Sequence, residues 1–419
     1  MNRFGTTAFN ILILSIALSA TPITDLCHAE DWPEWRGADR TDVSRETGLL
    51  QSWPADGPNR KWMFENAGVG YSGFSVVENR LFTMGTRDDQ TILIALDAST
   101  GKELWTTPMG DVLDNDWGNG PRATPTVRDG MVYAMSGPGV LVCAKAENGE
   151  IVWQRTMEEF GGKRPKWGYS ESVLIDDERL ICTPGGNVGM AVALNRTDGE
   201  LIWQTESLSG QPHYSSFIKV VHEGKPQYIQ LARKFAFGLE PETGEVLWES
   251  DWDGRVAVIP TPIYSEGRVY LTSGYGVGCK LIKLDGNKPT DVYVNKVMKN
   301  HHGGVVLLGD YLYGHSDGTG WVCQSFQSGE MKWKEKDVLD KGAMAIAGGM
   351  MYCVGEESGE VVLAKASPDG WSEHGRFTLS PQTKIRKSKG RIWTHPVISG
   401  GRLYLRDQNL IYCYDIKQP

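Results

Sequence analysis

Residues that could bind a ligand or exchange protons gather in eight short segments of this 419-residue chain. The segments carry unlike polar side chains, whereas the sequence around them is repetitive. Structural positions in a repeat converge on similar residues, so this contrast indicates a binding face. Four of the eight histidines belong to the set. Its members are Arg122, Tyr169, Glu171, His213, Tyr214, His301, His302, Lys341, Trp393 and His395.

The chemistry that these residues offer is that of a polar ligand site. Arg122 and Lys341 can hold an anionic group through charge-assisted hydrogen bonds. Glu171 is the candidate catalytic residue, as a general base, and Trp393 can stack on a flat ring. His301 and His302 are adjacent, and adjacent residues of a strand point to opposite faces. We therefore expect at most one of them to face the site, and we predict no metal centre. The alternative is that the set only hydrogen-bonds in a watery channel.

A repeated sequence motif indicates which elements position these residues. An acceptor residue, a Gly and a Trp recur at fixed spacing, about every 45 residues. The clearest copy is Asp97-Ala-Ser-Thr-Gly101-Lys-Glu-Leu-Trp105. Further copies end at Trp153, Trp203, Trp248 and Trp333. A period of this length, made of short strands and turns, predicts a radial or stacked repeat array and not several unrelated domains.

A second element fixes the number of repeats. A Gly-, Asp- or Asn-containing turn followed by alternating apolar residues, as in Asp129-Gly130-Met131-Val132-Tyr133, occurs eight times. This is a hairpin signal. We predict an all-β fold, an eight-bladed β-propeller with four-stranded antiparallel blades. The indoles fill the gaps between blades. The chain ends on a strand near Leu403 to Asp415 without its outer partner, and Arg60 to Phe64 supplies it. The two terminal strands thereby close the ring.

Composition limits the function classes. Charged residues make up 23% of the chain and the net charge is −9 without a basic stripe, so we expect no nucleic-acid partner. The one basic run, 384–389, and the acidic loop 114–120 are interpreted as solvated loops. The loop 114–120 lacks the bidentate acid of a calcium loop. We expect a monomer.

The first residues have the features of a targeting segment. Asn2-Arg3 precedes an apolar stretch, Ile11 to Leu18, and a small residue stands at Ala29. The stretch is too short to cross a bilayer. We predict a signal peptide over 1–29, a lead-in packing on the propeller over 30–59, and one propeller domain over 60–419. The protein is then exported, to the periplasm or the outside. Cys27 leaves lipid anchoring open.

The remaining six cysteines could form disulfides in an exported protein. The repeat register predicts otherwise. Cys143, Cys323 and Cys413 stand where other units have Ala, and Cys182 and Cys353 share a second small-residue position. Equivalent positions on different blades are too far apart to be bridged. We expect mostly free, buried thiols.

The Asp/Asn-x-x-Thr-Gly-x-x-x-Trp phrase, as a repeated set from about Trp62 to the C-terminus, resembles the docking motif of pyrroloquinoline quinone (PQQ) repeat propellers. That family contains quinoprotein alcohol and glucose dehydrogenases, which bind PQQ and calcium on the axis, and non-catalytic eight-bladed propellers. The lead-in Asp31-Trp-Pro-Glu-Trp-Arg-Gly37 resembles exported members. In the enzyme branch, Arg122 and Lys341 would face the quinone and Glu171 the calcium.

The chain departs from the enzyme branch at several points. It has no Cys-Cys pair, which alcohol-oxidising members place against the quinone, and the segments offer no Asp or Asn beside Glu171. We therefore expect a binding or scaffold module that holds a protein, small molecule or glycan at the axial funnel or top-face loops. The alternative is a PQQ-dependent dehydrogenase that oxidises an alcohol or sugar. A polysaccharide-active enzyme using Glu171, Tyr169 and His302 would lack a second acid.

Overall fold

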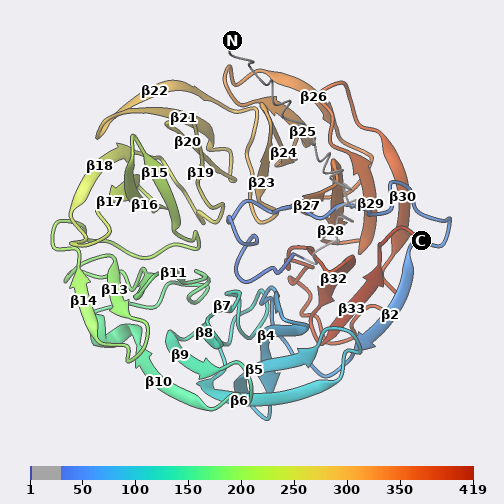
Figure 1. The fold of residues 1–419 in the computed structure, drawn as a ribbon, viewed down its shortest axis with the longest axis horizontal. Helices are drawn as coiled ribbons and strands as arrows, with labels where there is room; N and C mark the ends of the chain where they lie inside the picture. The colour runs from blue at the N-terminus through green and yellow to red at the C-terminus, as the bar shows by residue number, and fades with distance from the viewer. Residues whose placement is uncertain (2–29) are drawn as a thin grey trace.

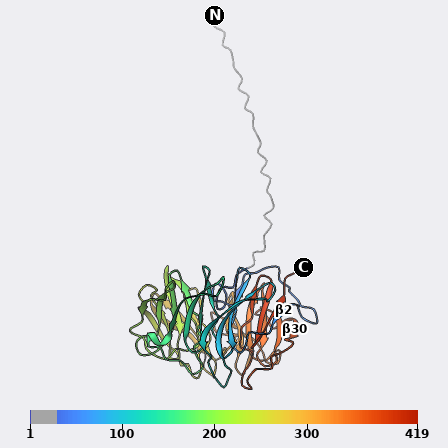
Figure 2. The same ribbon diagram turned by 90° about the horizontal axis from the view of Figure 1, so that it is seen from below.

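The computed structural model describes Met1 and residues 30–419. The predicted signal peptide and Cys27 therefore lie outside the described residues, apart from Met1. Within them the chain forms eight sheets arranged around one axis (Figure 1). Seen from the edge, the ring is a flat disc (Figure 2). The prediction of an all-β, eight-bladed propeller is confirmed. No helix of the described residues is long and apolar enough to cross a membrane.

Each of the first four blades is one consecutive antiparallel meander. Blade 1 holds β3 (Ser75–Val77), β4 (Arg80–Arg87), β5 (Gln90–Asp97) and β6 (Glu103–Asp111). Blade 2 holds β7 (Thr126–Arg128), β8 (Met131–Met135), β9 (Val140–Lys145) and β10 (Ile151–Thr156), followed by the short 3-10 helix η1 (Met157–Phe160). Blade 3 holds β11 (Leu174–Asp176), β12 (Arg179–Cys182), β13 (Val192–Asn195) and β14 (Leu201–Gln204). Blade 4 holds β15 (Ile218–His222), β16 (Lys225–Leu231), β17 (Phe235–Leu239) and β18 (Val246–Asp251).

The last four blades include the two that use the start of the chain. Blade 5 holds β19 (Ile263–Ser265), β20 (Arg268–Ser273), β21 (Gly278–Asp285) and β22 (Lys288–Asn295). Blade 6 holds β23 (Val305–Leu308), β24 (Tyr311–Ser316), β25 (Gly320–Ser325) and β26 (Met331–Glu335). Blade 7 holds β27 (Gly342–Ala347), β28 (Met350–Gly355), β29 (Glu360–Lys365) and β30 (Glu373–Thr378), with β1 (Val43–Ser44) added in parallel to β27. Blade 8 holds β31 (Val397–Ser399), β32 (Arg402–Asp407), β33 (Leu410–Asp415) and β2 (Asn59–Phe64).

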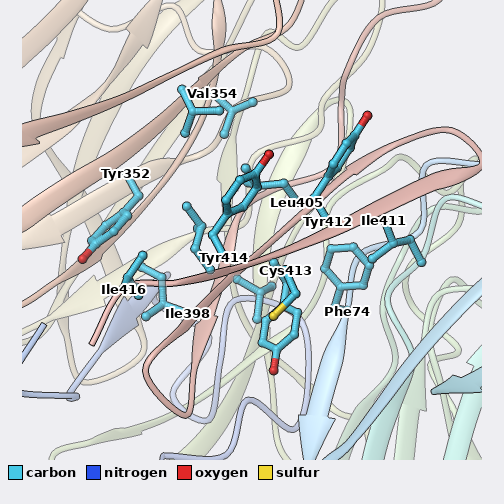
Figure 3. Packing of buried hydrophobic residues seen from close by; sticks show 14 of the residues in the cluster. Phe74, Tyr352, Val354, Ile398, Leu405, Ile411, Tyr412, Cys413, Tyr414 and Ile416 are labelled. Carbon is cyan, nitrogen blue, oxygen red and sulfur yellow. The ribbon is translucent and has the colours of Figure 1, made fainter. Parts of the chain in front are cut away.

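The ring closes in blade 8 as the terminal sequences predict. β2 pairs antiparallel with β33, and Trp62 lies opposite Cys413. Figure 3 shows the apolar packing beside this closure, where Tyr352 of blade 7, Ile411 and Cys413 of blade 8, and Phe74 of the connector into blade 1 lie in one buried cluster. Closure removes the two exposed edges that an open array would leave.

Tryptophans join successive blades through a common hydrogen bond. Trp62, Trp105, Trp153, Trp203 and Trp333 each donate their indole N–H to a backbone carbonyl in the outer turn of the next blade, at 2.7 to 3.1 Å. The turn glycine lies against the ring. At Gly101, with φ +72°, an added Cβ would stand 2.6 Å from the Trp62 indole. The repeated Gly is therefore required both by the turn and by the packing.

Two blades depart from this pattern. Trp248 of blade 4 donates to Gln227 in its own blade at 2.9 Å, because blade 5 replaces the Thr-Gly turn by the tight turn between β21 and β22. Blade 5 in turn uses Tyr293, whose hydroxyl donates to the Phe326 carbonyl. Blade 7 has Gly375 at the Trp position, and Trp53 of the lead-in fills the space beside it.

The six cysteines of the described residues are all free and buried, and each lies in a different blade. Cys143, Cys323 and Cys413 each pair in register with a docking tryptophan. Their role is that of small apolar residues beneath an indole, as the register predicts.

Candidate functional site

Residues 30–46 of the lead-in cross the axis of the ring and contact all eight blades. Backbone hydrogen bonds join Trp32 to Val76 of blade 1 and Pro33 to Val127 of blade 2, both at 2.7 to 2.8 Å. Glu46 accepts from the backbone N–H groups of Gly400 and Gly401 in blade 8. We call residues 30–46 the plug. In Figure 1 it is the blue segment at the centre of the ring.

Two buried arginines hold the plug in place. Arg40 donates to the carbonyls of Ser172, Val173 and Phe217, at the start of blades 3 and 4, and to Glu34 at 2.6 Å. Arg36 pairs with Asp42 at 2.6 Å and donates to the Val305 carbonyl of blade 6.

Blades 5 and 7 complete the contacts of the plug. The Trp35 indole donates to Thr261, just before blade 5, at 2.9 Å. The backbone N–H of Ile346 in blade 7 donates to the Asp42 carbonyl. The plug therefore fills the hub that a bare ring would leave open.

Above the plug lies a cavity of about 880 Å³, which we call the axial pocket. Trp35 forms part of its floor, and its ring lies 4.6 Å from that of His395. Most of the walls come from the connectors that lead into the inner strands, and every one of the eight contributes; turns after the second strands of blades 5, 6 and 7 supply the rest. A pocket of this size, closed at one end, suits a small molecule or a chain end.

The structure brings seven of the ten candidate residues to the pocket wall. They are Arg122, Tyr214, His301, His302, Lys341, Trp393 and His395. The other three lie elsewhere for a common reason. Ser170 and Ser172 line the pocket, so Glu171 between them points the other way along extended backbone. Tyr169 and His213 alternate in the same manner with the pocket residues Ser170 and Tyr214.

Glu171 lies between blades 3 and 4. It is buried and accepts hydrogen bonds from the backbone and hydroxyl of Thr183 and from Gln230. Burial raises its pKa to about 8. Tyr169 donates to the Pro184 carbonyl within the core, and His213 accepts from the Val258 backbone, with its pKa lowered to about 4 by burial. The structure therefore places these three side chains outside the pocket lining.

One wall of the pocket is a run of stacked rings. The ring centroids of Tyr71 and Trp393 are 4.9 Å apart, and Trp393 stacks on His302 with ring centroids 4.6 Å apart. The ring centroids of His302 and His301 are 3.7 Å apart, and those of His301 and Tyr275 are 4.5 Å apart. The expectation that at most one of the two histidines faces the site is wrong. Both line the pocket, because residues 301–304 precede β23 and do not form a strand.

A carboxylate and a lysine control the charge beside this wall. Glu356 accepts from the Trp393 indole at 3.1 Å and lies 3.8 Å from His302. Burial raises the pKa of Glu356 to about 7, against the opposing effect of Lys341. Lys341 pairs with Asp317 at 2.8 Å and lies 2.7 Å from His301. Burial, with Lys341 adding repulsion, lowers the pKa of His301 to about 3, so this ring is neutral.

Sequence reasoning missed several lining residues. Tyr275, Asp317 and Glu356 each stand in the turn after the second strand of blades 5, 6 and 7. This shared register is the signal that could have found them. The basic run 384–389 and the acidic loop 114–120 also come together. Lys387 donates to Asp114 at 3.1 Å and to Asn119 at 2.7 Å.

Comparison with known proteins places this geometry in a family. The family model described as outer membrane protein assembly factor BamB matches residues 51–137 and 88–335. The chain belongs to this family of PQQ-repeat propellers. Outer membrane protein assembly factor BamB of Shewanella oneidensis is 23% identical over 266 residues, which are 58% of this chain and 64% of that protein. The Escherichia coli K12 protein of the same name is 28% identical over 113 residues, 26% of each chain.

One relative in the comparison is described as an enzyme. Tetrathionate hydrolase of Acidithiobacillus ferrooxidans is 23% identical over 226 residues, 51% of this chain and 43% of that protein. The match thus spans less than two thirds of the length of each of these curated relatives.

Solved structures show the same fold. BamB from Moraxella catarrhalis superposes with a TM-score of 0.61 at 14% identity, over 85% of this chain and 99% of that one. Quinohemoprotein alcohol dehydrogenase from Comamonas testosteroni superposes with a TM-score of 0.65 at 11% identity, over 93% and 81%. At these identities the likeness concerns the fold alone.

The pocket residues do not fit the PQQ and calcium pair that the enzyme branch carries. Calcium takes six to eight oxygen ligands. Asp317 is already paired with Lys341, and Glu357 with Arg391 at 2.7 Å. No group of three His, Cys, Asp or Glu residues in the described chain is arranged to hold a metal ion. Trp393, the candidate stacking ring, already packs against Tyr71 and His302.

Proposed function

We propose that this chain is an exported binding propeller that holds a ligand in the axial pocket without transforming it. The observation that carries the proposal is the axial pocket itself. All eight connectors contribute unlike side chains to it, and the plug seals its base. A one-ended pocket suits capture of a small molecule or of a chain end from a partner.

Membership of the BamB family supports a binding role. The family description names an outer membrane protein assembly factor, so an envelope location and a protein or glycan partner agree with it. The charged groups of the pocket support the same conclusion. Its carboxylates have partners, and Glu171, the one acid of the expected set, lies outside it. This arrangement favours holding a ligand over catalysis.

Blocking the pocket tests the proposal. Ser170 is part of the wall and partly exposed, so Ser170→Trp should fill the cavity without disturbing a blade. Ser207→Trp, at an exposed position outside the lining, is the matched control. A panel of peptides, sugars and organic acids is screened by thermal shift. At least one compound should raise the Tm of the wild type and of Ser207→Trp, and not that of Ser170→Trp.

The dehydrogenase alternative is tested on the same protein. The wild type is titrated with PQQ and calcium, then assayed for dye-linked oxidation of alcohols and glucose. We expect no turnover. Stoichiometric PQQ binding with turnover would overturn the binding-protein proposal. Ligand-induced shifts that Ser170→Trp leaves unchanged would overturn the assignment of the pocket.

A further inference from the structure

The axial pocket collects positive charge that no acid neutralises, in a protein whose net charge is −9. Arg122 donates to the carbonyls of Trp167 at 2.7 Å and Gly118 at 2.9 Å. None of the ion pairs in the described chain includes Arg122 or Lys166, although both line the pocket. Burial lowers the pKa of Arg122, which reflects the cost of holding this cation out of water.

Arg122 is half-buried, and a guanidinium that lines a cavity without an acidic partner offers a binding site for an anion. Lysine and arginine elsewhere in the pocket do not compete for such a ligand, because they have acids of their own. Lys341 pairs with Asp317 and Arg391 with Glu357. A guanidinium binds the planar carboxylate group especially well, through parallel hydrogen bonds. The charge of the pocket thus favours a ligand with a carboxylate.

The rest of the lining indicates what that carboxylate is attached to. Three of the four cation–ring contacts in the described chain involve pocket residues, pairing Arg122 with Tyr71, Lys166 with Trp167 and Lys389 with Trp117. Trp117 remains 44% exposed and Tyr275 38%. Exposed ring faces in a concave site offer a surface on which the apolar face of a saccharide ring can pack.

Hydroxyl and carboxylate groups lie among these rings. Ser170 and Ser388 line the wall, and Asp317 and Glu357 retain acceptor capacity beside their cationic partners. Such groups can form hydrogen bonds with a ligand that carries many hydroxyls. A simple aromatic acid would leave them without partners on the ligand. We propose that the axial pocket binds an oligosaccharide bearing uronic acid, with its carboxylate on Arg122. This rests on the proposed function, since it names the ligand of the same pocket.

Calorimetric titration with α-1,4-trigalacturonate tests the inference. The fully methyl-esterified trisaccharide has the same backbone without the charge, and benzoate supplies a carboxylate without the sugar. Trigalacturonate should bind, and the ester and benzoate should bind at least about tenfold more weakly, the loss expected for a charge-assisted hydrogen bond.

Variants locate the carboxylate. Arg122→Gln should weaken binding about tenfold to a hundredfold, and Arg268→Gln, on β20 away from the pocket, should leave it unchanged. Because Arg122 also anchors two loops, Lys166→Gln provides a second variant at an exposed residue, and should weaken binding severalfold. Equal binding of the ester, or equal binding by both variants, would overturn the inference.

The test separates this inference from the proposed function. If trigalacturonate does not bind but another compound loses its thermal shift in Ser170→Trp, the inference is wrong and the binding function stands. If no shift depends on Ser170→Trp, both are wrong.

Discussion

Removing the Arg40 side chain should weaken the attachment of the plug to blades 3 and 4 and so destabilise the fold. In the folded protein this guanidinium spans from the lead-in to blades 3 and 4, and it satisfies Glu34 and three backbone carbonyls. The side chains of Arg40 and Glu34 are only 3% and 5% exposed. In Arg40→Ala the Glu34 carboxylate therefore stays buried without its partner.

The size of the effect follows from that burial. Breaking a buried ion pair by deleting one partner costs about 3–5 kcal/mol, because the remaining charge is uncompensated. Glu34→Gln keeps the shape and an oxygen for Arg40 to bond, so it should cost less, about 1–2 kcal/mol. Arg45→Ala removes a plug arginine whose side chain is 69% exposed, and it should have no measurable effect.

Urea unfolding followed by tryptophan fluorescence measures all three variants. The expected order of destabilisation is Arg40→Ala, then Glu34→Gln, then Arg45→Ala. A loss below about 1 kcal/mol for Arg40→Ala, or an effect equal to that of Arg45→Ala, would show that the plug does not hold the hub and would refute the reasoning.

Three further predictions concern the blades and the pocket. Trp153→Ala removes a buried docking indole and should cost about 3–5 kcal/mol in urea unfolding, whereas Trp117→Ala, at an exposed ring, should cost less than about 0.5 kcal/mol; equal losses would contradict the docking role. Glu356 has a folded pKa of about 7 against an ordinary 4.5, so its contribution to stability falls as pH rises from about 4.5 to about 7. The free energy of unfolding of Glu356→Gln relative to that of the wild type should therefore rise by up to about 3 kcal/mol between pH 4.5 and 8. The contributions of the other buried acids are common to both proteins and cancel. A pH-independent difference would show that Glu356 is not held protonated. The six described cysteines should react with a thiol reagent only after unfolding, and a faster reaction in the native protein would contradict their burial.

The fold could be predicted from the sequence because its determinants are local and repeated. A docking tryptophan, its turn glycine and the small residue opposite recur in most blades, so the register of one blade predicts the others. Trp248 and Gly375 show where this fails. The partner turn of Trp248 is shorter, and the ring beside Gly375 comes from the lead-in.

The site was predictable only in part, for two physical reasons. Side chains along an extended connector point alternately toward and away from the axis, and the sequence alone does not say which of two neighbours faces it. The sequence therefore does not separate Tyr169, Glu171 and His213 from their pocket-facing neighbours. The path of the plug depends on contacts between residues far apart in the chain, such as Arg40 with Phe217. No local pattern reports such contacts.

A crystal structure of the protein grown with trigalacturonate tests the account most directly. We expect continuous density for residues 30–46 across the hub and a sugar carboxylate on Arg122 in the cavity above. An open hub with the lead-in on the outer surface, or a sugar bound on the rim with the pocket unaltered, would contradict it.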